Sequence, residues 1–171
     1  LAEDMDERTL GSMASDLIAE YKKDKNSRKE WEEAYIKGLE LLGTKYQEVT
    51  KPFKGASGVT HPLLAESVTQ FQAQAYKELI PSDGPVRTQV VGLQTPQIEA
   101  QADRVKEYMN FLLMEEMEEY TTDMDQMLFY LPLSGSTFKK IYYDAMIGRP
   151  CSKFIPAEDL IVPYYASDLK D

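Results

Sequence analysis

The chain has 171 residues, enough for one hydrophobic core, and a formal net charge of −10. Because tight nucleic-acid binding depends on basic side chains that neutralise phosphates, this acidity argues against a free-standing DNA-binding domain. The apolar runs fall short of the ~20 residues that span a bilayer, and the acidic first residues lack the basic region of a signal peptide. The single cysteine cannot form an internal disulfide. The composition therefore predicts a soluble protein made in a reducing cytosol.

Residues 1–43 are predicted to form an N-terminal segment of two helices. Apolar residues recur at helical spacing on both sides of a polar stretch, 22–26, which we expect to interrupt the helix. Ser27 and Glu30 have the spacing of a capping box at the start of the second helix. Gly43 is placed to end that helix in the left-handed conformation. The first apolar stripe consists of Leu10, Met13, Leu17, Ile18 and Tyr21.

Residues 44–59 are predicted to be a linker, because proline and glycine punctuate them. A helix over 60–80 is expected to follow, with Thr60 as its cap and His61-Pro62 in its first turn, where a missing proline N–H has little effect. The apolar edge that we expect this helix to bury consists of Leu64, Val68, Phe71, Ala75 and Leu79. If that edge is buried, Phe71→Ala should destabilise the fold by about 3–5 kcal/mol. A loss near zero would mean that the edge is available to a neighbour.

The middle of the chain is predicted to hold one short strand and two further helices. Residues 87–91 alternate enough to be a strand. Thr95 is expected to cap a long helix over 95–118, because a first-turn proline follows it. A further helix over 122–131 is expected to end at Pro132–Gly135.

From Ser136 the sequence becomes β-branched and aromatic. Strands are predicted at 136–144, 153–155 and 160–162, with a turn at 145–150 between the first two. The chain is therefore expected to be an α+β protein, mainly α-helical with a small antiparallel sheet near its C-terminal end. We treat 60–171 as one helical and small-sheet region.

Several side chains suggest chemistry, but each also has a simpler structural explanation. The glycine-bearing loop 54–58 precedes a helix, where anions can bind, but it lacks the spacing and context of a P-loop. Cys151 needs an activating base to be a nucleophile, and the only histidine, His61, is far away in sequence and has no partner at metal-ligand spacing. Acidic residues at 115–125 interleave with methionines, which fits a solvated helix face. We expect no catalytic residue, no cofactor and no metal.

Six polar or aromatic side chains are candidates for contact with a neighbouring subunit or partner. These are Gln70, Gln74, Lys139, Lys140, Tyr142 and Tyr164. The glutamines lie opposite the apolar edge of their helix. The lysines are neighbours in a strand and should point to opposite faces, one of them inward and paired with an acid. The tyrosines could anchor an interface, although core packing with one hydroxyl at the surface is the commoner role.

Five stretches, in a consistent order, resemble the portal protein, or head-tail connector, of short-tailed bacteriophages. They are PFKGASGVTHPLLAESVTQFQAQAYKELIP at 52–81, PVRTQVVG at 85–92, ADRVKEYMNFLL at 102–113, DQMLFYLPLSGSTFKKIYYD at 125–144 and FIPAEDLIVPYYASDL at 154–169. Together they cover most of the chain from about Trp31 onward. No single stretch is a catalytic signature, so the resemblance rests on the ordered set.

The resemblance implies a structural subunit of a twelve-membered ring in the virion, at the portal vertex where double-stranded DNA enters and leaves the head. It implies docking to the terminase, the major capsid protein and tail adaptor proteins, no membrane partner, and assembly in the host cytoplasm. The chain would be an N-proximal, wing-like piece of a longer protein, with the stem, clip and crown beyond Asp171. An acidic surface would keep DNA from sticking to the channel that it slides through.

Two other functions stay open at this point. A metal-dependent nuclease subunit would use the carboxylates Glu115, Glu119, Asp123 or Asp125. A helical scaffold or adaptor unrelated to phages would use the helix over 95–118 as its interaction surface. The adaptor hypothesis predicts a stable monomer or dimer, whereas the portal hypothesis predicts a ring.

Overall fold

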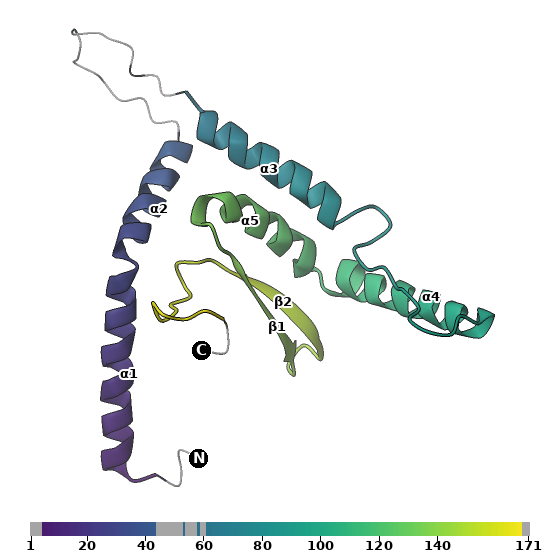
Figure 1. Ribbon diagram of the computed structural model, residues 1–171, viewed down its shortest axis with the longest axis horizontal. Helices are drawn as coiled ribbons and strands as arrows, with labels where there is room; N and C mark the ends of the chain where they lie inside the picture. Colours follow the sequence, from purple (N-terminus) through teal and green to yellow (C-terminus); the bar gives the residue numbers. More distant parts are fainter. Residues whose placement is uncertain (1–4, 44–52, 54–57, 59–60, 169–171) are drawn as a thin grey trace.

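The computed structural model describes residues 5–43, 53, 58 and 61–168, and it confirms the α+β class. Figure 1 shows mostly helical structure with a two-stranded antiparallel sheet toward the C-terminal end. In chain order the elements are α1 (Glu7–Ser27), α2 (Lys29–Leu42), α3 (Leu63–Leu79), α4 (Pro96–Phe111), the π-helical turn η2 (Leu112–Glu116), α5 (Glu119–Ser134), β1 (Phe138–Asp144) and β2 (Arg149–Ile155).

Helix α5 forms the centre of a small body. Helix α3 packs against α5, strand β2 packs against α5 as well, and α2 contacts both helices. The buried apolar residues of this body are few: Tyr35, Val68, Ile80, Met117, Leu128 and Cys151. Helices α1 and α4 extend from the body in different directions, and neither contains a buried residue (Figure 1).

The N-terminal helices differ from prediction in where they break. Helix α1 continues through 22–26 to Ser27, so the expected interruption there is wrong. Charged residues such as lysine favour helix, so a polar stretch alone does not end one. The hydroxyl of Ser27 donates to the carbonyl of Asp24 (2.7 Å) instead of capping α2, and the break falls at Arg28, with φ −96° and ψ 8°. Gly43 follows α2 with φ −80°, so its predicted left-handed conformation is also wrong.

Helix α3 begins at Leu63, so His61 and Pro62 precede the helix instead of forming its first turn. Thr60, the predicted cap, and nearly all of the predicted linker 44–59 lie outside the described residues.

The covered face of α3 is rotated from the predicted apolar edge. Leu64, Val68 and Ala75 are buried or half-buried, but Phe71 is 41% exposed and Leu79 is 50% exposed. The face toward α5 passes instead through Gln72, whose amide donates to the carboxylate of Asp125 (2.7 Å). A polar contact at the helix interface therefore takes the place that we expected Phe71 to occupy.

Helix α4 is capped as predicted but ends early. The hydroxyl oxygen of Thr95 accepts a hydrogen bond from the N–H of Ile98 (3.3 Å). After Phe111 the chain widens into η2, where the N–H of Met117 donates to the carbonyl of Leu112 (2.9 Å), so the helix does not run on to 118.

Helix α5 begins before the predicted limit and continues past Pro132, and Gly135 follows its last residue as predicted. It starts at Glu119, contains Pro132 and ends at Ser134, and its C-cap, Gly135, has φ 78°. Proline removes one backbone hydrogen bond, but the packing of α5 against α3 and β2 keeps the helix intact past it.

The predicted hairpin is confirmed, and two predicted strands are wrong. Strands β1 and β2 pair with Lys139 opposite Phe154 and Ile141 opposite Ser152, and the turn between them ends at Gly148 with φ 75°. Residues 160–162 form no strand, because the carbonyl of Leu160 accepts from the guanidinium of Arg28 (2.8 Å) and not from a neighbouring strand. Residues 87–91 form no strand either.

Candidate functional site

The two strand lysines point to opposite faces, as predicted. Lys140 is exposed, with its ammonium 5.3 Å from the ring centroid of Tyr142. The ammonium of Lys139 is buried and lies 3.9 Å from the ring centroid of Tyr120, a cation–π contact. In the described ranges that ammonium makes no hydrogen bond, so the predicted ion pair with an acid is not formed. Burial lowers the pKa of Lys139, and the nearby carboxylates Asp123 and Glu119 oppose that shift.

Two carboxylates of α5 bind the outer edge of β2. Glu119 accepts from the backbone N–H of Ser152 (3.2 Å), and Asp123 accepts from the backbone N–H of Phe154 (2.7 Å). Residues 119 and 123 are four apart, so they share one face of α5 and match the two-residue repeat of the strand edge. Sequence analysis missed this contact because it joins a helix to a strand about thirty residues away.

Glu119 is also held by Arg149 in a bidentate ion pair. The two guanidinium nitrogens lie 3.0 and 2.9 Å from the two carboxylate oxygens. These hydrogen bonds lower the pKa of Glu119 to about 2, and its backbone contacts act in the same direction. Arg149 also lies near the thiol of Cys151, whose pKa burial raises, so that thiol is not activated as a nucleophile.

A second polar cluster fastens α2 to the C-terminal segment. The guanidinium of Arg28 donates to the carbonyls of Ala157 (3.1 Å), Glu158 (2.7 Å) and Leu160 (2.8 Å). The indole N–H of Trp31 donates to the carbonyl of Ser134 at the end of α5 (2.9 Å). Sequence analysis also missed this cluster, whose only local signal is an arginine at the break between α1 and α2.

The predicted contact residues do not form one cluster. Gln70 and Gln74 are exposed on the outer side of α3, Tyr142 is 38% exposed on β1, and Tyr164 is 84% exposed in the C-terminal segment. Each is accessible to a partner, but they belong to three separate parts of the molecule.

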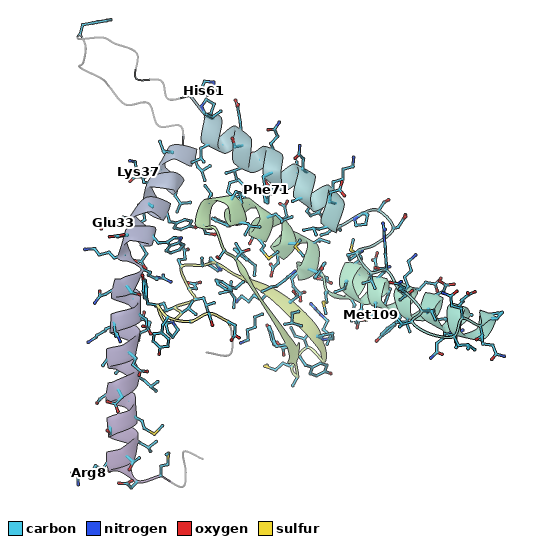
Figure 2. All side chains as sticks on the ribbon, in the orientation of Figure 1. Arg8, Glu33, Lys37, His61, Phe71 and Met109 are labelled. Carbon is cyan, nitrogen blue, oxygen red and sulfur yellow. The ribbon has the colours of Figure 1, made fainter. Side chains whose placement is uncertain are left out.

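Helix α1 carries an accessible apolar stripe. The predicted stripe is present, and every member is exposed: Leu10 36%, Met13 46%, Leu17 63%, Ile18 55% and Tyr21 52%. Figure 2 shows the side chains of the lower part of α1, near Arg8, projecting into open space. No residue of α1 is buried by the part of the chain that the structure describes.

The acidic residues do not gather into a metal centre. Across residues 5–43, 53, 58 and 61–168, no group of three or more His, Cys, Asp or Glu side chains is arranged to hold a metal ion. Glu119 and Asp123, two of the four nuclease candidates, already bind Arg149 and the β2 backbone. Among the described helices, none is both long enough and apolar enough to cross a bilayer.

Comparisons with protein families, with curated proteins and with solved structures each returned no match.

Proposed function

We propose that this chain is part of the structural subunit of a phage portal ring, in the wing-like region that holds neighbouring subunits together. The ring would form the vertex where double-stranded DNA enters and leaves the head, and would dock the terminase, the capsid shell and tail adaptors. The ordered resemblance of five stretches supports the family, and the exposed surface supports a role in assembly.

The exposed area is the observation that carries this proposal. The chain exposes 13701 Å². A compact monomer of 19.5 kDa would expose about 8,500 Å² by the usual scaling with mass. Among the described residues, helices α1 and α4 contribute to this excess, because neither contains a buried residue. Such a surface is typical of a subunit completed by its neighbours.

Helix α1 is one exposed region that a neighbouring subunit could cover. It is 21 residues long and has no buried residue. Helices gain most of their stability from packing an apolar face, and an isolated helix is marginal in water. We infer that a neighbouring subunit covers the stripe from Leu10 to Tyr21. A scaffold or adaptor would also need a partner to cover this helix. The two functions differ in the assembly that they predict, which is a ring for the portal and a monomer or dimer for the adaptor.

Particle imaging of the complete protein by electron microscopy tests the proposal. We expect rings with a central hole. The variant Leu17→Glu places a charge in the stripe and should abolish rings, whereas Ser12→Glu, on the same helix outside the stripe, should leave them intact. Circular dichroism of both variants checks that the helices are retained. A compact monomer at high concentration would overturn the proposal, and a closed dimer would favour the adaptor.

A further inference from the structure

The two outer edges of the β1–β2 hairpin differ in whether their backbone N–H groups are hydrogen-bonded. The outer edge of β2 is sealed, because Glu119 and Asp123 accept from the N–H groups of Ser152 and Phe154. Pro150, two residues earlier on the same edge, has no N–H to donate. These are the devices by which proteins stop a strand edge from pairing with another chain.

The outer edge of β1 has neither device, and its protection is limited to the charges of Lys139 and Lys140. Because the N–H groups of Ser152 and Phe154 point away from β1, their partners Ile141 and Lys139 point away from β2, as does Tyr143. None of these three outward N–H groups has a hydrogen-bond acceptor among the described residues. Ile141 is 74% exposed and Tyr143 is 67% exposed. An edge strand with unpaired N–H groups is a template for another strand.

Residues 87–91 have the shape of a strand but no partner. Their burial alternates: Arg87, Gln89 and Val91 are exposed, whereas Thr88 and Val90 are half-buried. A period of two is that of an extended backbone with one covered face. That face lies over α4, in a shallow groove lined by Ile98, Ala102 and Val105. No backbone hydrogen bond is made within or from 87–91 in the described part of the chain.

Asn110 fixes the start of this segment on α4. Its carboxamide oxygen accepts from the N–H of Val86 (2.9 Å), and its amide nitrogen donates to the carbonyl of the same residue (3.2 Å). Gly84, with φ +88°, lies so close that a Cβ there would be 2.5 Å from Asn110. The extended segment is therefore held in place before any partner binds, which lowers the entropy lost on pairing.

We propose that β1 of one copy pairs antiparallel with residues 87–91 of a second copy. With Ile141 opposite Gln89, Tyr143 lies opposite Arg87 and Lys139 opposite Val91. This register uses all three outward residues of β1 and opposes no like charges. Parallel pairing of the two segments would bring Lys139 opposite Arg87, which is unfavourable.

The face of the sheet that would meet the second copy is complementary in charge to α4. Lys140 and Lys153 are directly opposite each other in the hairpin and are both exposed, an unfavourable pair of like charges. In the proposed register they face α4 of the second copy, whereas Lys139 lies on the opposite face of β1, over Tyr120 of α5. Helix α4 presents three exposed carboxylates at four-residue spacing, Glu99, Asp103 and Glu107, which outnumber its two basic residues, Arg104 and Lys106. This acidic row is our reason for choosing a second copy as the occupant.

The contact joins two different surfaces, so each copy that offers β1 still has its own 87–91 segment free. Such a head-to-tail contact continues from copy to copy and closes into a ring if the rotation allows it. The inference rests on the proposed function, since it names one contact between neighbours in the assembly.

Disulfide trapping in the complete protein tests the contact. Gln89→Cys and Ile141→Cys are made as separate proteins, mixed and oxidised with diamide. We expect a mixed dimer at least tenfold above that from mixing Gln89→Cys with Met146→Cys. Met146, at the hairpin turn, is 97% exposed against 74% for Ile141, so random collision would favour it. The native Cys151 is 5% exposed, and the unmodified protein controls for its reactivity.

Each result has a distinct meaning. If Met146→Cys is trapped by Gln89→Cys as efficiently as Ile141→Cys is, the contact is overturned. If Ile141→Cys forms a dimer with itself in preference to the mixed dimer, the contact is overturned in favour of symmetric β1–β1 pairing. Rings without the mixed disulfide overturn this contact and leave the proposed function standing. If the mixed disulfide forms in a protein that makes no rings, the contact is supported and the proposal of a ring is overturned.

Discussion

The central body and the α1 arm carry similar amphipathic sequence and use it in opposite ways. Leu128 of α5 is 2% exposed, between α3 and β2, whereas Leu17 of α1 is 63% exposed. Both lie on helices of ordinary length with apolar residues at helical spacing. The comparison shows that an apolar stripe predicts a helix with one face suited to burial. It does not predict whether that face is buried by the same chain.

The largest expected difference between the two regions is the effect of truncating a leucine. Leu128→Ala should destabilise the body by about 2–5 kcal/mol, because it leaves a cavity in a small core. Leu17→Ala should change the stability of the unassembled protein by less than ~0.5 kcal/mol. Urea denaturation under conditions without assembly measures both. Equal losses would show that α1 packs within its own chain.

The next effect concerns the joint between the arm and the body. Arg28→Met keeps most of the aliphatic stem and removes the donors to three carbonyls, and should destabilise the fold by about 2–3 kcal/mol. Hydrogen exchange should show the loss of protection concentrated at 157–160. Arg8→Met, on the exposed end of α1, is the matched control and should have no effect. Unchanged exchange at 157–160 in Arg28→Met would contradict the role of this cluster.

The carboxylate that seals β2 predicts a dependence on pH. Because the pKa of Glu119 is lowered from 4.5 to about 2, the folded state favours its ionised form. This contribution is present above about pH 4.5 and is lost as pH falls toward 2. Glu119→Gln should cost about 1–2 kcal/mol at neutral pH, a value reduced for partial solvent exposure, and should flatten the decline in stability across that window. An unchanged acid profile would argue against the ion pair with Arg149.

The smallest expected effect separates the covered and open sides of α3. Phe71 is 41% exposed and Val68 is 2% exposed. Phe71→Ala should therefore cost about 1 kcal/mol or less, below the about 2 kcal/mol expected for Val68→Ala, although it removes the larger side chain. Thermal melting of the two variants gives their order. A loss of about 3–5 kcal/mol for Phe71→Ala would restore the original expectation that this edge is buried.

The sequence predicted well those features that depend on residues close together in the chain. Thr95 before a proline predicted the start of α4, and the β-branched and aromatic run after Ser136 predicted β1. The opposite orientation of Lys139 and Lys140 followed from the two-residue repeat of a strand. Pro132 misled us because packing of α5 on two sides outweighs the loss of one hydrogen bond.

Contacts between distant segments could not be predicted in this way. Arg28 binds carbonyls near residue 160, and Glu119 binds a strand edge near residue 152, and nothing in either local sequence names its partner. Residues 87–91 show the same limit, because a strand needs a second strand beside it and local propensity supplies only the extended shape.

By itself, the sequence determined the α+β class, the amphipathic character of the helices and the hairpin, since these depend on side-chain periodicity and turn residues within a few positions. The tertiary structure decided which apolar faces are covered, which edge of the hairpin is sealed and which residues hold distant segments together. Those outcomes depend on which elements meet in space, and here the described elements leave α1 and the edge of β1 exposed.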